Sequence, residues 1–214
     1  MKKFAYRCGK FSLLLLMLFG VTGCGTYNRL IMLEQTVNKK WADVQSVYQR
    51  RADLIPNLVN TVSGAANFEK STLTEIANAR ASIGRVTLDP NKAPQDAAKL
   101  EEFQQAQGQL ATALSRLISV AENYPQLRAN QNFQDLQAQL EGTENRISVE
   151  RNNFNAAVQE YNTALGTFPT NMLNKMFGFQ PRPFFTAQAG SEKAPAVNFN
   201  FGSPAPSPAP AGTP

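Results

Sequence analysis

Residues 133–168, FQDLQAQLEGTENRISVERNNFNAAVQEYNTALGTF, are the strongest guide to the architecture, because apolar side chains recur through them at alternating steps of three and four. That spacing places these side chains on one face of an α-helix. With a rise of 1.5 Å per residue, the helix would be about 50 Å long. The stripe on its face consists of Phe133, Leu136, Leu140, Glu144, Ile147, Arg151, Phe154, Val158, Tyr161, Leu165 and Phe168.

Three more segments share this periodicity, over residues 30–62, 73–83 and 103–121. The third should stop before Pro125, because a residue that precedes proline is disfavoured in helical geometry. Almost no β-type alternation separates the segments. The sequence therefore predicts an all-α protein, an elongated antiparallel four-helix bundle of up-and-down topology over residues 27–168. The first stripe contains Leu30, Glu34, Val37, Trp41, Val44, Tyr48, Arg51, Ile55, Leu58 and Val62.

Pro56 lies inside the first predicted helix. A proline removes one backbone donor and clashes with the preceding turn, so it bends or breaks a helix. We therefore predict a kink near Pro56, or a break with a new helix starting near Asp53 or Asn57.

The N-terminus is typical of an export signal. Four basic residues within positions 1–10 precede the apolar run 11–21, which is shorter than the ~20 residues that an α-helix needs to cross a membrane. The sequence Val21-Thr22-Gly23-Cys24 follows and resembles the bacterial lipobox. We expect residues 1–23 to be removed and Cys24 to bear diacylglycerol and an N-acyl chain. An ordinary signal with an incidental cysteine, or a permanent span, is the alternative.

The location follows from the residues after the lipobox. Residues 24–26 would form the lipid-anchored N-terminus. Gly25 stands where an aspartate would resemble an inner-membrane retention signal. We therefore expect a lipoprotein of the cell envelope that faces the periplasm, with the outer membrane favoured over the inner.

Composition excludes several classes of function. The chain has no histidine and two cysteines, of which Cys8 would leave with the signal, so His-based triads and imidazole zinc sites are excluded. Four of the 21 basic residues and none of the 16 acidic residues lie within positions 1–23, so the mature chain is nearly neutral. This argues against nucleic-acid binding. We expect no catalytic residues, no metal and no cofactor apart from the acyl chains on Cys24.

Five charged residues lie at positions that the periodicity predicts to be buried. A buried charge is costly unless it is paired, so we predict ion pairs between helices, with Arg51 or Arg80 as the partner of Glu144. Such pairs either fix the register of the helices or form a binding or catalytic site. The five residues are Glu34, Arg51, Arg80, Glu144 and Arg151.

The C-terminal part has a different composition. Residues 169–189 form an apolar extension that is too short for a membrane span and rich in glycine and proline. It either packs over the end of the bundle or forms a partner-binding patch of Phe177, Phe179, Phe184 and Phe185. Residues 190–214 are rich in alanine and proline, a composition that favours a disordered tail.

Several stretches together resemble the LemA family of bacterial proteins. Residues 50–59, RRADLIPNLV, look like its most recognisable motif, and residues 122–133 and 144–155 continue the match in order. The resemblance extends over about residues 27–185. Two departures matter: Phe154 stands where the family typically has tyrosine, and a lipobox replaces the family's usual membrane-spanning N-terminus.

The resemblance implies a four-helix bundle tethered to a membrane, with no established enzymatic activity. It also implies a partner in the envelope, such as a membrane protease or a TPM-domain protein. Three hypotheses follow: a non-enzymatic scaffold or interaction protein, an adaptor or sensor in envelope stress proteolysis, and a carboxylate-based metal-binding protein or enzyme that uses Glu34 and Glu144.

Overall fold

The computed structural model describes residues 2–64, 69–168 and 170–186, and their side chains except for those of residues 2–24 and 173–176. The side chains of the predicted signal segment and of Cys24, and the predicted tail 190–214, lie outside the described part of the chain. Every regular element in the described residues is a helix. The all-α prediction is therefore confirmed.

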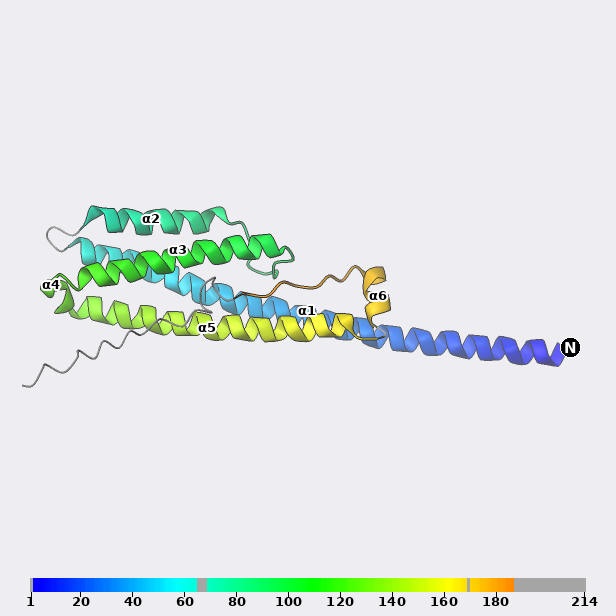
Figure 1. Ribbon diagram of the computed structural model, residues 1–214. Coiled ribbons are helices and arrows are strands. Elements are labelled where there is room, and N and C mark those ends of the chain that lie inside the picture. Colours follow the sequence, from blue (N-terminus) through cyan, green and yellow to red (C-terminus); the bar gives the residue numbers. More distant parts are fainter. Residues whose placement is uncertain (1, 65–68, 169, 187–214) are drawn as a thin grey trace, which may run out of the picture.

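The two longest helices, α1 (Lys2–Ser63) and α5 (Gln131–Gly166), lie side by side (Figure 1). They run antiparallel, because Trp41 of α1 contacts Phe154 of α5 and the later residue Arg51 contacts the earlier residue Glu144. A second pair, α2 (Lys70–Arg85) and α3 (Ala97–Ala121), packs along them. A single turn, α4 (Pro125–Arg128), precedes α5.

At the end of the molecule opposite α4, α1 continues beyond the remaining helices toward the N-terminus (Figure 1). The short helix α6 (Thr170–Phe177) lies across this end, next to the point where α1 leaves the body. Where side chains are described, we find no helix with both the length and the apolar character of a membrane span.

Local sequence explains where the helices start and stop. The Asp96 side chain caps α3 by accepting a hydrogen bond of 2.9 Å from the amide of Ala98, and Asn130 caps α5 in the same way. Pro125 is the first residue of α4, a position where its missing donor is tolerated. Since α5 ends at Gly166, Phe168 lies beyond the helix and is exposed, and its predicted place on the buried stripe is wrong.

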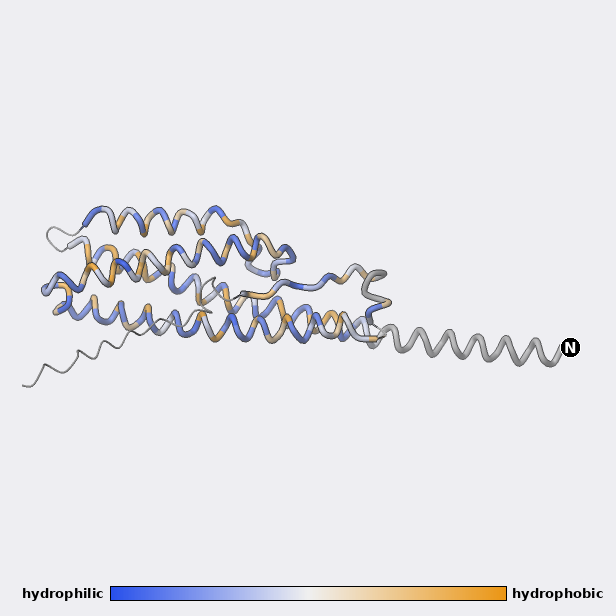
Figure 2. Tube along the Cα trace, viewed as in Figure 1, coloured by the Kyte–Doolittle hydropathy of each residue, from blue (hydrophilic) through white to orange (hydrophobic). Residues whose placement is uncertain are grey.

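The predicted stripes form the core. All apolar members of the predicted stripe on α1 are buried, and Figure 2 shows apolar residues recurring among polar ones along the helices. The predicted stripe on α3 is buried too and consists of Phe103, Ala106, Leu110, Leu114, Leu117 and Ala121. Burial of each large side chain contributes about 1.5–3 kcal/mol. The core divides into two clusters. The first, which we call the Trp41 cluster, includes Trp41, Phe103, Phe154, Tyr161 and Phe185. The second, which we call the Leu117 cluster, includes Ile55, Leu58, Ile76, Leu110, Leu117 and Phe133.

Pro56 does not break the first helix. The α1 helix passes through Pro56 and continues to Ser63, so no new helix starts near Asp53 or Asn57. Ile55 and Leu58 on either side of the proline are fully packed in the core, and this tertiary packing offsets the backbone hydrogen bond that the proline removes. The kink near Pro56 remains a prediction.

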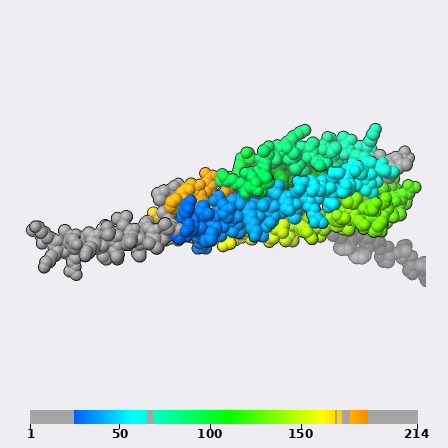
Figure 3. All heavy atoms as spheres, turned by 180° about the vertical axis from the view of Figure 1, so that it is seen from behind, coloured from blue at the N-terminus to red at the C-terminus, as the bar shows by residue number. Residues whose placement is uncertain are grey.

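After α6 the chain turns and runs back along the body as residues 178–186, which we call the returning segment (Figure 1). Gly178 makes the turn with a φ of 75°, a conformation that favours glycine. In the space-filling view the returning segment, in orange, lies against α1 (Figure 3).

Candidate functional site

Three arginine side chains connect the helices inside the body, and the first is Arg51 on α1. Its Nη1 donates to Oε2 of Glu144 on α5 at 2.8 Å. Its Nη2 donates to the side-chain and main-chain oxygens of Gln107 on α3. The guanidinium also lies 5.2 Å from the centre of the Tyr48 ring. One arginine thus ties three helices together.

Arg51, Gln107 and Glu144, which we call the central polar layer, lie between the two apolar clusters. On α1, α3 and α5 alike, the residues on one side of the layer belong to the Trp41 cluster and those on the other side to the Leu117 cluster. Arg51 and Gln107 are buried, whereas Glu144 reaches the surface. The layer therefore links the three helices at one level along their axes.

The second arginine, Arg182, belongs to the returning segment and is almost completely buried. Its Nη2 donates to Oε1 of Glu34 on α1 at 2.5 Å, and its Nη1 donates to the main-chain oxygen of Ala93 at 3.0 Å. Asn162 on α5 holds the main chain of the same residue: its Oδ1 accepts from the Arg182 amide and its Nδ2 donates to the Arg182 carbonyl, both at 2.9 Å.

The same kind of clamp recurs one heptad earlier on α5. Asn155 accepts a hydrogen bond from the Phe185 amide at 2.8 Å and donates one to its carbonyl at 2.9 Å. An amide side chain has both a donor and an acceptor, so it can pair with an extended backbone as a neighbouring strand would. The two asparagines therefore hold the returning segment in one register along α5.

At the Asn155 clamp, the side chain of Phe185 enters the core. Its ring stacks on Trp41 at 6.1 Å and meets Phe154 edge-on at 5.4 Å. The third arginine, Arg151, lies 4.8 Å over the Phe185 ring and donates to Gln104 at 3.0 Å and to the Thr186 carbonyl at 2.9 Å. The returning segment is therefore an integral part of the Trp41 cluster.

Two tyrosines lie next to these arginines, and burial raises the pKa of both. Burial has the largest effect on Tyr48, opposed by the charges of Arg151 and Arg51. Burial and the carboxylate of Glu34 raise the pKa of Tyr161, opposed by Arg182. Both phenols stay protonated at neutral pH, because burial raises a pKa that is ordinarily about 10. These groups suit structural hydrogen bonds and ion pairs better than proton transfer.

The described residues contain no candidate metal site, because no three acidic, cysteine or histidine side chains among them lie close enough together to bind one ion. Glu34 and Glu144, the carboxylates considered for such a role, lie at different levels of α1 and α5. Each contacts its own arginine.

The five charged residues that were predicted to be buried differ in their exposure to solvent. Arg51 is buried and contacts Glu144, as one of the two predicted pairings requires. Glu34 and Arg151 are partly buried. Two expectations are wrong. Glu144 is more than half exposed, and Arg80 lies on the outer side of α2, because Ile76 and Ala79 are the residues that face the core there.

The four phenylalanines of the predicted patch also differ in their exposure to solvent. Phe177 and Phe184 are exposed, whereas Phe179 packs against the core and Phe185 is buried within it. A continuous patch of all four is therefore wrong. Sequence reasoning missed Arg182, whose only signal is a lone charge between Pro181 and Pro183 in an apolar segment.

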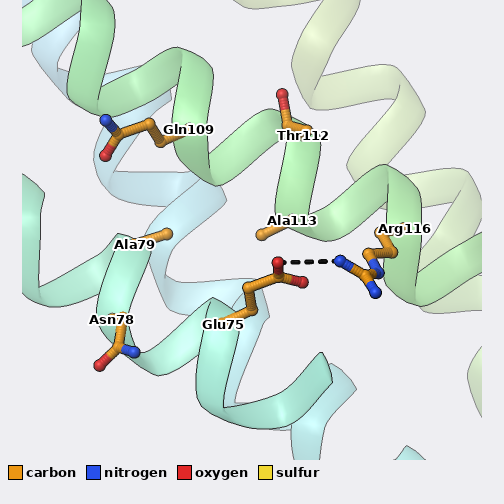
Figure 4. Close-up of a pocket in the computed structure, with 7 residues that line it drawn as sticks. All are labelled: Glu75, Asn78, Ala79, Gln109, Thr112, Ala113 and Arg116. Atoms are coloured by element: carbon orange, nitrogen blue, oxygen red, sulfur yellow. Dashed lines mark hydrogen bonds and ion pairs between the residues drawn. The ribbon is translucent and has the colours of Figure 1, made fainter. Parts of the chain in front are cut away.

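An open surface groove lies between α2 and α3 (Figure 4). An ion pair of 3.0 Å joins Arg116 of α3 to Glu75 of α2 across it, and both side chains are about half exposed. Asn78 and Gln109 line the groove toward its other end. None of the three internal arginines, Arg51, Arg151 and Arg182, lines this groove.

These features define an all-helical protein whose long helices are aligned by internal polar contacts. The chain belongs to the LemA family, whose model matches residues 40–199. Relatives include magnetosome protein MamQ of Magnetospirillum gryphiswaldense, 24% identical over 193 residues that cover 81% of this chain and 70% of that protein. Magnetosome protein MamQ 2 of Paramagnetospirillum magneticum is 24% identical over 178 residues, covering 74% of this chain and 64% of that protein. Protein LemA of Metamycoplasma hominis is 21% identical over 161 residues, covering 75% and 69%.

Proposed function

We propose that this protein is a lipid-anchored, non-enzymatic scaffold of the bacterial cell envelope, built as an antiparallel four-helix bundle. The observation that supports this most directly is that α1 both contains position 24 and forms one side of the core along the whole body. A tether at the start of α1 would therefore position the entire bundle. Two relatives are named magnetosome proteins, and neither name refers to a reaction.

The length of α1 sets how far the scaffold would extend from the membrane. Residues 25–63 of α1 extend about 58 Å at 1.5 Å per residue. The α2–α3 groove and α4 would be held at a distance from the membrane, and α4 would lie near the far end. We propose that exposed faces of this outer part bind an envelope protein, with a membrane protease or a TPM-domain protein as candidates.

The anchor is proposed to be Cys24, acylated after removal of residues 1–23, with the protein on the periplasmic side and the outer membrane favoured. Acyl chains add about 0.8 kcal/mol per buried CH₂, so several chains on one residue suffice to retain a nearly neutral protein at a membrane. Cys24→Ala should abolish both the incorporation of labelled palmitate and the removal of residues 1–23, because the cysteine of a lipobox receives diacylglycerol before cleavage. Cys8→Ala, the matched control, should change neither. A Cys24→Ala protein that still takes up palmitate, or that still loses residues 1–23, would contradict the assignment of Cys24 as the anchor.

A photo-crosslinking residue tests the scaffold role. Placed at Asn78, in the α2–α3 groove, it should give a discrete adduct with an envelope protein in living cells. The control position is Asn145, an exposed residue on α5. No adduct from either position under any growth condition would contradict the scaffold role.

A further inference from the structure

The end of the molecule where α1 leaves the body has large apolar side chains that nothing in the described residues covers. Phe168 is 79% exposed and Met172 is 71% exposed. Phe177 and Tyr27 are each about 40% exposed, and their rings meet edge-on at 5.1 Å. We call Tyr27, Phe168, Met172 and Phe177 the end face.

The end face spans three elements that come together there. Tyr27 is on α1, Phe168 lies between α5 and α6, and the other two residues are on α6. Tyr27 also contacts Phe179 at 5.7 Å, which joins the end face to the returning segment. Figure 1 shows α6 running across the long axis of the body rather than along it. A helix in this orientation would lie parallel to a membrane that the body meets end-on.

Charge distinguishes this end from the rest of the chain. All 16 acidic residues lie outside positions 1–33 and 161–191, the stretches from which the end face is built. Arg29 is exposed next to Tyr27, and Lys175 is in α6. The nearest carboxylate along α1, that of Glu34, is paired with the buried Arg182. Exposed aromatic residues together with an exposed basic residue, Arg29, suit the headgroup region of an anionic bilayer.

Proximity to the anchor selects the bilayer over a protein partner. Tyr27 is three residues from Cys24, a distance of about 5 Å along the helix. An acylated Cys24 would therefore bring lipid headgroups directly against Tyr27 and α6. A protein partner would have to enter this narrow space, whereas the bilayer is already present there.

We propose that the end face is a membrane-contact surface, in which α6 lies at the bilayer interface and Phe168 and Met172 enter the headgroup region. The proposal rests on the lipid tether proposed above and goes beyond it. The tether retains the protein at the membrane, and the end face would hold the body upright on it. Two kinds of contact, acyl chains and an interfacial helix, would then fix both position and orientation.

The test uses the full chain, purified from membranes and reconstituted into vesicles that contain anionic lipid. In one variant Phe168→Trp places an indole on the end face. In the matched control Val149→Trp places one at an exposed position of α5, about 25 Å nearer the middle of the body. The native Trp41 is fully buried and supplies a constant background, which is measured in the parent protein. The readout is quenching of the added emission by lipids brominated high on their acyl chains.

We expect the vesicles to carry both proteins on flotation, the added emission at position 168 to be mostly lost, and that at position 149 to be retained. Flotation without quenching at 168 would overturn the membrane-contact surface and leave the tether intact, as would dimerisation through this face. Quenching at both positions would show a body lying flat on the bilayer and would also overturn the proposal. Failure to float would overturn the tether and the contact surface together.

Discussion

Glu34→Gln should destabilise the protein more than Glu144→Gln, although each removes one carboxylate charge from one arginine. The arginine side chains are buried to the same degree, with 1% of Arg182 and 3% of Arg51 exposed. The carboxylates differ, because the Glu34 side chain is 21% exposed and that of Glu144 is 57% exposed. Water therefore screens the second pair far more than the first.

The magnitudes follow from that difference. Breaking a buried ion pair costs about 3–5 kcal/mol, whereas an exposed pair contributes about 0–1 kcal/mol. Glutamine keeps one acceptor, so Glu34→Gln belongs at the lower end, with a loss of about 3 kcal/mol. In Glu144→Gln, Arg51 keeps its bonds to Gln107, and we expect about 1 kcal/mol.

Urea unfolding of the detergent-solubilised full chain at pH 7, followed by circular dichroism at 222 nm, measures both losses. The comparison requires equal m-values, since a changed m-value would indicate a changed unfolded or folded state. Glu160→Gln, at an exposed position of α5, is the control and should leave the unfolding midpoint unchanged. Equal losses for the two variants, or a larger loss for Glu144→Gln, would refute the link between carboxylate burial and pair strength.

Three further predictions concern the returning segment and the tyrosines. Phe185→Ala should lower the free energy of unfolding by about 3–5 kcal/mol, because it leaves a cavity beside Trp41 and Phe154; a loss below 1 kcal/mol in urea would show that the segment is not part of the core. Asn155→Ala removes both hydrogen bonds to the Phe185 main chain, so at roughly 1 kcal/mol each the hydrogen-exchange protection of that amide should fall about 30-fold, and the exposed control Asn152→Ala should not change it. Burial raises the pKa of Tyr48 and Tyr161, so the folded state holds both protons more tightly than the unfolded state; their contribution is complete below about pH 10 and is lost as the pH rises through the folded pKa values. Urea midpoints between pH 8 and 11 should fall less steeply in a Tyr48→Phe, Tyr161→Phe double variant than in the parent, and parallel curves would contradict this.

Periodicity predicted the parts of the fold in which one helix face packs on another. Arg51 and Glu144 each lie on a stripe of three and four steps, so the sequence brought both to the contact between α1 and α5. The same pattern failed for Arg80, because α2 buries a narrower stripe on which Ile76 and Ala79 face the core. It failed for Phe168 because the helix ends two residues earlier.

The returning segment could not be predicted by periodicity at all. An extended chain clamped by Asn155 and Asn162 has neither a helical nor a strand-like apolar repeat. The partner of Glu34 is Arg182, 148 positions away, and no local pattern connects the two. Such contacts depend on where the chain turns at Gly178, which only the folded structure shows.

The central polar layer explains why the helices have one alignment. The pairs Arg51–Glu144 and Trp41–Phe154 follow a single antiparallel register of α1 against α5. A slip of one heptad would bring Trp41 against Tyr161 or Ile147, which an apolar core tolerates. The same slip would bring Arg51 against Arg151 or Gln137, leaving a buried guanidinium repelled or without its carboxylate.

Replacing the layer with apolar residues should therefore preserve stability and weaken the alignment. We predict that an Arg51→Met, Gln107→Leu, Glu144→Leu variant unfolds at the same urea concentration as the parent or higher, because it removes two buried polar side chains and an ion pair that water already screens. The single tryptophan reports the alignment, because its indole donates to the Asp89 carbonyl at 2.9 Å and should give one amide-region NMR signal in the parent. The variant should give several indole signals or a broadened one. One sharp signal at an unchanged shift would show that the apolar side chains alone set the register.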